Sequence, residues 1–434
     1  MNSIKTTPIT WIRNNQGILV KLIQDLVRIP SISGKEEEIQ KFVYKKLTEL
    51  DLSPEFIQPD IETLQKSDDY FETTSYTKFG YKNRPNVVGI LKGTGKGRSL
   101  CLSGHIDVVS PEPVEQWNRD PWGGEEDGDF IYGRGAGDMK AGVASIILAV
   151  QALKETQTEL NGDVLIETTI EEEDGGIGGS LYLRLTQPKA DAAIIPEPGI
   201  PGSISINIAS AGVMYFRVIV TGIPAHAATA HFGVNAIVKM VPLIEALKTL
   251  NIERQKKISY KYAEADPSMK GKATTLNIGV INSGDWPSTV PALCILECRI
   301  GFPPGETREM VINQIEKTIL DAGNKDMWLK EHPPKVEWFG WKARPHEQNP
   351  EHPFVKLLDK NIKQIAGIEP VYGGGSAGWD GRFFVHHGTP VVAFGPSSEN
   401  NHSIDERVSI SSTLKTTEIL ISTIMDWCGV KLNK

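Results

Sequence analysis

Apolar runs alternate with amphipathic stretches along the first half of the chain, and this alternation predicts strands that alternate with helices. In the helical stretches the apolar residues recur every three or four positions, whereas the strand-like runs are short and almost continuously apolar. The predicted helices are 16–30, a second one that follows Ser33-Gly34, and 141–153, and the predicted strands are 86–91, 99–105, 164–170 and 192–196. This order favours a three-layer α/β domain, with a mostly parallel sheet between layers of helices.

The section from residue 209 to residue 340 follows a different order. Its predicted elements are strand 213–221, helix 234–250, a polar insert at 251–272, strands 274–282 and 290–300, helix 304–320 and strand 334–339. The order β-α-β-β-α-β is the split βαβ, or ferredoxin-like, motif. The α/β pattern then returns, with helices 352–366 and 411–427 on either side of a strand at 390–394. We therefore expect 1–208 and 341–434 to form one domain, and 209–340 to form an inserted α+β domain.

The composition narrows the class of protein. The chain has 434 residues, too many for one hydrophobic core, so its length agrees with two domains. A formal net charge of −8 argues against a nucleic-acid-binding protein, which would carry a basic surface. The polar N-terminus does not resemble a signal peptide, and no apolar run reaches about 18 residues, so neither secretion nor a membrane span is expected. Four scattered cysteines fit neither a disulfide framework nor a cysteine-based zinc site, and we expect a cytoplasmic enzyme.

Histidines and carboxylates follow one predicted strand after another. They are His105 and Asp107, Asp138 after a glycine-rich turn, Glu172 and Glu173, Glu197, and His402 beyond the strand at 390–394. In an open α/β sheet, ligands bind at the carboxyl ends of the strands. Carboxylates that converge there repel one another unless cations lie among them, and a solvated acidic surface would not place acids repeatedly at the ends of apolar strands. The set suits a site for two zinc ions, with one further carboxylate as the general base for a bridging water.

The glycine-rich segment 133–142 has an alternative interpretation as a phosphate-binding loop. Its Gly-x-Gly-x-Gly pattern lacks the dinucleotide spacing, and Lys140 is not followed by Ser or Thr as it would be in a P-loop. We therefore interpret the segment as a tight turn that places Asp138 in a cavity and begins a buried helix.

Four motifs together resemble one known family. They are Ser-Gly-His-Ile-Asp-Val-Val at 103–109, Gly-Arg-Gly-Ala-Gly-Asp-Met-Lys-Ala-Gly at 133–142, Glu-Glu-Glu-Asp-Gly-Gly at 171–176 and Asn-His-Ser-Ile-Asp-Glu at 401–406. This set resembles the co-catalytic di-zinc amidohydrolases and metallopeptidases, which include acetylornithine deacetylase, succinyl-diaminopimelate desuccinylase, aminoacylase and the glutamate-releasing carboxypeptidases. The resemblance covers nearly the whole chain, including the inserted domain.

The resemblance implies a role for each of these metal-binding side chains. The implied ligands are His105 and Glu197 for one zinc ion, Glu173 and His402 for the other, and Asp138 as the bridge between them. The peptide bond between Asp138 and Met139 is expected to be cis, as it is in the family.

The residues beside the ligands are assigned in the same way. Asp107 would orient His105, and Glu172 would be the general base. The family usually has Asp at the position of Glu171, a departure that moves no ligand. The glycines at 175 and 176 support the register in which Glu172 is the base and Glu173 the ligand.

The resemblance also places substrate contacts outside the metal ligands. The segment Gly222 to Ala227 matches the family segment whose histidine, here His226, reaches the partner subunit's site and supports the oxyanion. Arg299 matches the arginine that holds a substrate carboxylate, a task suited to its bidentate fork. The implied substrate loop contains Gly375, Ser376 and Arg382, although Arg382 could equally form a structural ion pair. Ser288 stands where the family often has a substrate-binding Asn, and Trp286 nearby would make the pocket more apolar.

The function implied by the resemblance is that of a cytoplasmic hydrolase that removes an acyl group from an N-acyl amino acid. It would be a homodimer through the inserted lid domain, with two Zn²⁺ per subunit that Co²⁺ or Mn²⁺ can replace, and no nucleic-acid or membrane partner. The nearest alternative is a dipeptidase or carboxypeptidase of the same family, acting on a short peptide. A non-catalytic relative would have lost a ligand or the base, and all of them are present here. A nucleotide-binding enzyme is the weakest alternative.

Overall fold

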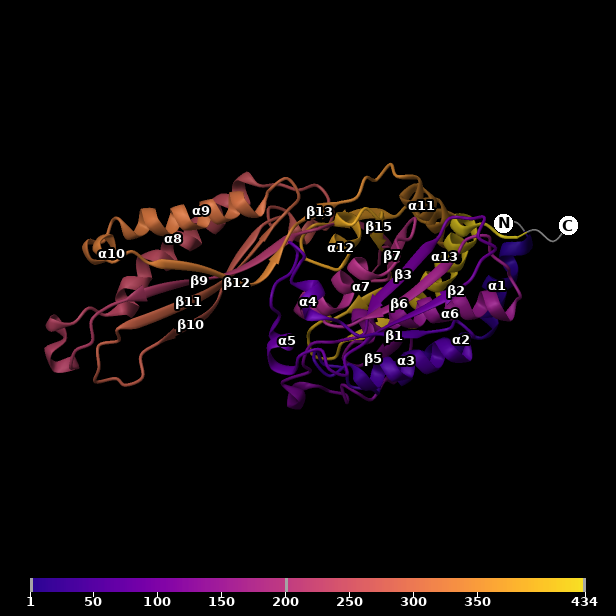
Figure 1. Cartoon of the computed structure of the whole chain (residues 1–434), viewed down its shortest axis with the longest axis horizontal. Helices are drawn as coiled ribbons and strands as arrows, with labels where there is room; N and C mark the ends of the chain where they lie inside the picture. The colour runs from indigo at the N-terminus through magenta and orange to yellow at the C-terminus, as the bar shows by residue number, and fades with distance from the viewer. Residues whose placement is uncertain (1–2, 200–201, 432–434) are drawn as a thin grey trace. The chain divides into compact units, whose positions relative to one another are not determined.

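The protein consists of two compact units, each of which is described here by itself. The structure is a computed structural model that describes residues 3–199 and 202–431. The first unit comprises Met1–Ile208, Gln348–Tyr372 and Trp379–Lys434, and the second comprises Ala209–Glu347 and Gly373–Gly378 (Figure 1). The second unit therefore extends beyond residue 340, where we expected the inserted domain to end.

A mixed sheet whose centre is parallel forms the middle of the first unit. Its strand order is β1-β2-β6-β3-β7-β15-β8-β13, and β14 also pairs with β8; β13 and the last two residues of β8 and of β14 are counted in the second unit. The central neighbours β6, β3, β7 and β15 run parallel, and the outer pairs are antiparallel. The strands are β1 Glu55–Ile57, β2 Asn86–Leu91, β3 Leu100–His105, β6 Val164–Thr169, β7 Ala193–Ile195, β8 Ser205–Ser210, β13 His346–Glu347, β14 Val371–Gly374 and β15 Val391–Ala393. The predicted α/β class is confirmed.

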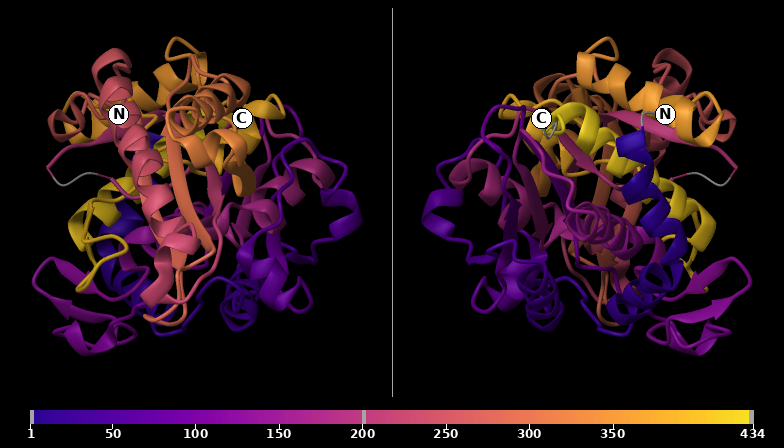
Figure 2. Two further views of the ribbon diagram at one scale, coloured as in Figure 1. Left: turned by 90° about the vertical axis from the view of Figure 1, so that its left-hand side faces the viewer. Right: turned by 90° about the vertical axis from the view of Figure 1, so that its right-hand side faces the viewer.

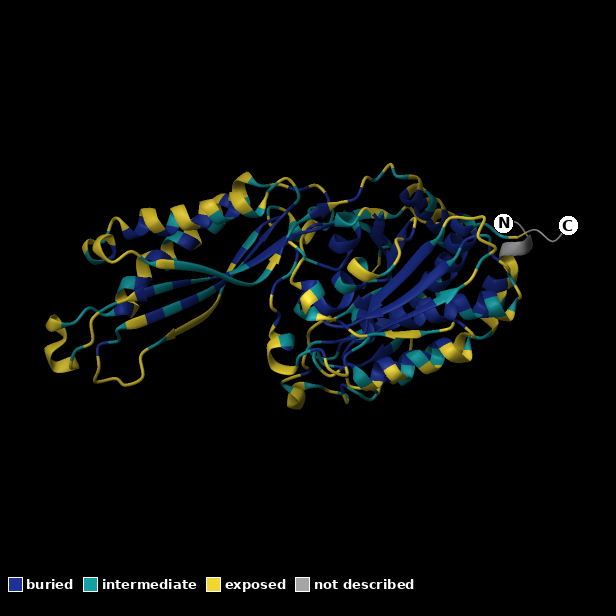
Figure 3. Ribbon diagram, in the orientation of Figure 1, coloured by how far each residue is buried: buried dark blue, intermediate teal, exposed yellow. Residues whose placement is uncertain are grey.

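Helices cover this sheet and bury its central strands (Figure 3). The longer ones are α1 Ser3–Asn14, α2 Gln16–Val27, α3 Glu37–Glu49, α6 Ala141–Glu155, α11 Pro353–Ala366 and α13 Ile410–Cys428; the shorter ones are α4 Ile61–Leu64, α5 Thr74–Phe79, α7 Tyr182–Thr186 and α12 Gly381–His386. Helix α6 packs against α1, α2 and α13. The segment Ala136–Glu155 is long and apolar enough to cross a membrane, but 89% of its apolar window is buried inside the structure, as in the core helix of a folded domain.

A small antiparallel sheet of four short strands, in the order β16-β17-β5-β4, completes the first unit. Its strands are β4 Glu125–Asp127, β5 Phe130–Tyr132, β16 Ser398–Glu399 and β17 Arg407–Ser409. The pairing of β5 with β17 holds the segment before Asp138 beside the segment that follows His402.

The second unit is an antiparallel sheet covered on one face by two helices (Figures 1 and 2). The strand order is β10-β11-β9-β12, and α8 and α9 pack against each other. The elements are β9 Gly212–Thr221, α8 Ala236–Lys257, β10 Thr275–Ser283, β11 Leu293–Phe302, α9 Arg308–Gly323, α10 Met327–Glu331 and β12 Lys335–Ala343. Alternate residues of β9 and β11 are buried against α8 and α9, because successive side chains of a strand point to opposite faces. The predicted β-α-β-β-α-β order is present.

Two elements depart from the sequence-based expectation because tertiary packing stabilises them. Helix α1 forms in a polar N-terminal stretch, where Ile9 and Ile12 are buried and Arg13 pairs with Glu418 of α13 at 2.6 Å. Helix α8 continues beyond the predicted end at residue 250 into the polar insert, because Arg254 is buried there and pairs with Glu306 at 2.7 Å. Local sequence patterns carry no information about such distant partners.

Candidate metal centre

His105 ends strand β3, and its buried imidazole faces two carboxylates. Its Nε2 lies 3.0 Å from Oδ1 of Asp138 and 3.9 Å from Oε2 of Glu197. Its other ring nitrogen, Nδ1, lies 2.9 Å from the backbone carbonyl of Asp107. The parallel neighbour β7 ends two residues before Glu197, so the sheet brings both side chains to the same edge.

Asp138 lies between His105 and a second histidine, His402. The Nε2 atom of His402 is 3.2 Å from Oδ2 of Asp138 and 3.0 Å from Oε2 of Glu173. The two oxygens of Asp138 therefore face different histidines. Ligand atoms of His105, Asp138 and Glu173 all lie within 4.8 Å of one another. A carboxylate that bridges two metal ions requires such an arrangement. The peptide bond between Asp138 and Met139 is cis, which confirms that prediction.

The donor atoms fit divalent metal ions. Oε1 of Glu173 and Oε1 of Glu197 are buried and have no hydrogen-bond partner among residues 3–199 and 202–431. A buried carboxylate oxygen without a partner is costly, and a cation beside it offsets that cost. Imidazole nitrogens and carboxylate oxygens are typical ligands of zinc and of other divalent transition metals. The residues that converge on Asp138 therefore form a candidate metal centre.

The charges of the centre perturb one another strongly. Burial raises the pKa of Glu172 well above its usual value, and burial raises that of Glu197 to about 8. Burial also opposes ionisation of Asp138, but hydrogen bonds from His105 and His402 outweigh it and lower its pKa. Hydrogen bonds to Asp138 and Glu173 raise the pKa of His402 to about 10. Titratable groups shifted in opposite directions within one cleft are typical of an active site.

The metal-free centre holds protons that metal ions must displace, so we expect metal affinity to rise with pH. Below pH 8 Glu197 is largely protonated, and below pH 10 His402 is a cation, and neither binds a metal in that form. From pH 6 to pH 8 the apparent affinity for Co²⁺ should increase at least about tenfold, with net proton release. Calorimetric titrations in two buffers of different ionisation enthalpy measure both quantities. A constant affinity without proton release would contradict this expectation.

Asp107 contacts more of the centre than the sequence predicted. Its Oδ1 accepts a hydrogen bond from the amide of Glu172 at 3.0 Å, and its Oδ2 accepts one from the amide of Glu173 at 3.2 Å. Ser33 donates to the same Oδ2 at 2.6 Å. The Nδ1 atom of His105 is 3.7 Å from Oδ1 of Asp107, farther than from the Asp107 carbonyl. One residue therefore holds His105 through its carbonyl and the Glu172-Glu173 segment through its carboxylate.

Glu171 anchors the same segment from the other side. It has a left-handed backbone with φ of 66°, and its side chain is fully buried. Its Oε1 accepts from the hydroxyls of Thr73 and Ser75 at 2.7 and 2.6 Å, and its Oε2 accepts from the hydroxyl of Tyr81 at 3.0 Å and the amide of Gly178 at 2.8 Å. The sequence predicted only that Glu171 is not a ligand. Its anchoring role became visible in the fold, because the donors come from distant segments.

Replacing Glu171 by Ala should destabilise the protein strongly. The substitution leaves buried hydroxyls and an amide without their acceptor and removes a carboxylate 3.6 Å from the buried Arg84. Loss of one member of such a buried network typically costs about 3 kcal/mol or more. Denaturant unfolding in the presence of a chelator measures the change. The exposed Glu38, replaced by Ala, is the control; equal effects of the two substitutions would contradict the prediction.

Three predicted site residues lie in the second unit. His226 is exposed, and its Nδ1 accepts from the amide of Ala228 at 3.0 Å. Ser288 is exposed, and its backbone carbonyl accepts from the amide of Ala227 at 2.9 Å. Arg299, in β11, is partly buried opposite Tyr215 of β9. Their predicted roles in substrate binding stay predictions.

The predicted substrate loop is divided between the two units. Gly375 and Ser376 belong to the second unit. Gly375 has a left-handed φ of 85°, and a Cβ at this position would lie 2.4 Å from the ring of Tyr260. Arg382 belongs to the first unit, where it is buried and donates to the carbonyls of Trp379 at 2.9 Å and Gly175 at 2.6 Å. These bonds place Arg382 next to the loop that carries Glu172.

Two buried carboxylates near the centre were not singled out from the sequence. Asp380 is buried, and its negative charge raises the pKa of Glu172 after the larger effect of burial. Glu406 accepts hydrogen bonds from the amides of Gly137 and Asp138, both at 3.0 Å. The available signal for Glu406 was its place in the Asn-His-Ser-Ile-Asp-Glu motif, four residues after His402.

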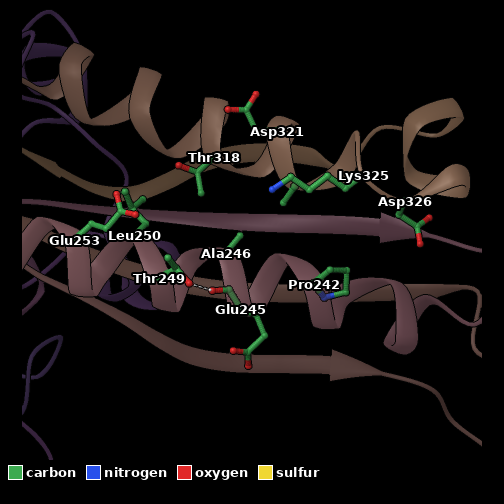
Figure 4. Close-up of a pocket in the computed structure, with 11 residues that line it drawn as sticks. Pro242, Glu245, Ala246, Thr249, Leu250, Glu253, Thr318, Asp321, Lys325 and Asp326 are labelled. Atoms are coloured by element: carbon green, nitrogen blue, oxygen red, sulfur yellow. Dashed lines mark hydrogen bonds between the residues drawn. The ribbon is translucent and has the colours of Figure 1, made fainter.

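A separate cavity of about 530 Å³ lies between α8 and α9 in the second unit (Figure 4). Its charged lining residues are Lys325 and four acids, namely Glu245, Glu253, Asp321 and Asp326, and its other lining residues are apolar side chains and threonines. It contains none of the predicted site residues, so the candidate site remains at the carboxyl edge of the sheet in the first unit.

Comparisons with known proteins agree with this geometry. The sequence model of Peptidase family M20/M25/M40 matches residues 101–426. The chain is 32% identical over 368 residues to the N-formyl-4-amino-5-aminomethyl-2-methylpyrimidine deformylase of Bacillus subtilis, covering 81% of this chain and 85% of that one. It is 28% identical over 403 residues to the succinyl-diaminopimelate desuccinylase of Nautilia profundicola, covering 89% and 98%. A dinuclear metal-binding peptidase from Bacillus subtilis shares the fold, with a TM-score of 0.65, 16% identity, and coverage of 96% of this chain and 100% of that one.

Proposed function

Because the chain belongs to peptidase family M20/M25/M40 and is a hydrolase of that family, we propose that it removes an acyl group from an N-acyl amino acid. The observation that carries the proposal is Asp138 between His105 and His402, with the buried Glu172 on the adjacent loop. The family match agrees with the resemblance inferred from the motifs. The deformylase and desuccinylase relatives support removal of an acyl group from a linear amide.

We propose two Zn²⁺ per subunit, which Co²⁺ or Mn²⁺ can replace. His105 and Glu197 would hold one ion, Glu173 and His402 the other, and Asp138 would bridge them. When bound, such ions polarise the amide carbonyl and lower the pKa of a bridging water.

The chain's own residues supply the proton transfer. Glu172 takes the proton of the attacking water and delivers it to the leaving amine, so a single carboxyl acts first as base and then as acid. Burial raises the pKa of Glu172 well above its usual value, a shift that favours the proton-donating step. Asp107 holds the backbone of this residue, because its Oδ1 accepts the amide hydrogen of Glu172 at 3.0 Å. His226 of the partner subunit would donate to the oxyanion.

The proposed substrate contacts rest on the family resemblance. Arg299 would hold a substrate carboxylate, and Gly375, Ser376 and Ser288 would line the substrate site. Arg382 would act from behind the Glu172 loop, because its guanidinium already donates to two backbone carbonyls.

We further propose a cytoplasmic homodimer that associates through the second unit. Large apolar side chains are exposed on α8 and on the edge strand β10, namely Ile237, Val238, Val241, Val280 and Ile281. Exposed apolar side chains in such numbers are typical of protein–protein contacts. All four cysteines are free and buried, which suits a reducing compartment.

Hydrolysis of a substrate panel by zinc-loaded protein, with a chelated control, tests the proposed function. The panel contains N-acetylornithine, N-succinyl-diaminopimelate, N-acetyl and N-formyl amino acids, a formylated aminomethylpyrimidine and several dipeptides. Metal-dependent release from an acylated amino acid supports the proposal. Release of formate from the pyrimidine alone would instead assign the activity of the 32% identical deformylase. Hydrolysis of dipeptides alone would show that the protein is a peptidase.

A further inference from the structure

Glu406 links two chain segments that each carry a proposed metal ligand. Its side chain is fully buried, and Oε1 accepts the amide hydrogens of Gly137 and Asp138, both at 3.0 Å. Its other oxygen, Oε2, lies 2.6 Å from Nη1 of Arg134. One carboxylate therefore contacts the backbone of Asp138 and the arginine four residues before it.

Arg134 completes the connection from the opposite direction. It is 2% exposed, and its Nη2 donates to the backbone carbonyl of Ser403 at 3.1 Å, next to His402. The amide of Gly133 donates to the carbonyl of Glu406 at 2.9 Å. Side-chain and main-chain hydrogen bonds thus join the segment 133–138 to the segment 402–406 in both directions.

We propose that Arg134 and Glu406 are positioning residues that set the distance between Asp138 and His402, and that they thereby determine metal affinity. The inference deepens the proposed function and rests on it. The separation of 3.2 Å between His402 and Asp138 depends on how the two backbones are held, because each side chain is short. Two successive amides bound to one carboxylate oxygen fix the orientation of the Asp138 backbone, and the ion pair fixes that carboxylate.

This arrangement differs from an ordinary buried ion pair. A pair that only stabilises the fold would affect unfolding and leave the metal affinity of the folded protein unchanged. Residues that orient metal ligands indirectly typically change metal affinity by about 10- to 100-fold when they are replaced. Metal affinity measured on folded protein therefore separates the two roles.

Calorimetric titration of chelator-treated, folded protein with Co²⁺ tests the inference without reference to any substrate. Glu406→Gln keeps an acceptor for the amides but places an uncharged amide against Arg134, so affinity should fall at least about tenfold. Glu399→Gln is the matched control, because the Glu399 carboxylate pairs with Arg407 and makes no hydrogen bond or ion pair with 133–138 or 402–406 in the part of the chain that the structure describes. Its affinity for Co²⁺ should equal that of the parent.

A second variant tests whether lower stability of the fold explains the loss of Co²⁺ affinity. Arg134→Met combined with Glu406→Met leaves no unpaired buried charge, so the thermal midpoint should recover relative to Glu406→Gln. Its Co²⁺ affinity should stay low, and the visible absorption of bound Co²⁺ should differ from that of the parent. If both variants bind Co²⁺ as tightly as the parent does, this inference is wrong but the proposed metal centre is unaffected. A parent protein that binds no Co²⁺ would overturn the proposed metal centre, and the inference with it.

Discussion

Glu172→Gln should bind metal like the parent and lose about a thousandfold or more of its kcat. Glutamine has nearly the shape of glutamate, so the hydrogen bond from the residue 172 amide to Asp107 is preserved. Its side-chain amide accepts no proton at neutral pH, and general base catalysis is commonly worth about 10²- to 10⁴-fold. Metal content after dialysis and steady-state kinetics on the best substrate of the panel measure the two effects.

The neighbouring Asp174→Asn variant is the control for this experiment. Asp174 accepts a hydrogen bond from the amide of Ser75 at 2.6 Å and lies on the same loop, but it forms no hydrogen bond or ion pair with His105 or His402 among the residues that the structure describes. It should keep most of the parent's kcat. Full activity of Glu172→Gln would assign the general base to another group, and loss of metal in that variant would make Glu172 a ligand.

Asp138→Asn should abolish both tight metal binding and activity. The carboxylate of Asp138 presents one oxygen to each histidine, and the two histidines oppose the effect of burial on its charge. An amide offers one oxygen and one NH₂ group, and the nitrogen cannot ligate a cation in that form. Replacing a residue that supports a metal ligand typically lowers metal affinity by about 10- to 100-fold. Replacing a ligand itself should cost more, so we expect the affinity for Co²⁺ to fall by about 100-fold or more.

Metal analysis after dialysis, together with activity at increasing Co²⁺, measures this loss. The control is Asp127→Asn, which changes the net charge by the same amount at an exposed position of β4. This variant should behave like the parent. Retention of two tightly bound ions by Asp138→Asn would show that Asp138 is not the bridge.

The strands of the first unit and the polar residues that follow their carboxyl ends could be predicted, because both depend on local sequence. Short apolar runs that end at His105, Glu172 and Glu197 follow from burial of the strands, and the parallel arrangement gathers their ends at one edge. Helix α1 and strand β8 could not be predicted in this way. Each depends on a partner far along the chain, α13 for the helix and β15 for the strand.

The contacts around the proposed ligands were less predictable than the positions of those residues after the ends of strands. The sequence indicated that Asp107 belongs beside His105, but its carboxylate binds the amides of Glu172 and Glu173. Arg382 looked equally like a substrate contact and an ion-pair partner, and the hydrogen bonds that it also donates to two backbone carbonyls were not predicted. Backbone amides and carbonyls have no signature in a sequence, so contacts made through them become visible only in the fold.

The inserted position of the second unit affects how the protein is synthesised. Asp138, Glu173 and Glu197 leave the ribosome before the second unit, whereas His402 and helix α13 leave it only after that unit is complete. A nascent chain that has emerged as far as residue 208 already carries all three proposed acidic ligands but not His402, which faces Asp138 from the other side. If these residues hold metal as proposed, we expect tight metal uptake only at the last stage of biosynthesis, and a chain truncated before His402 would lack one of the proposed ligands.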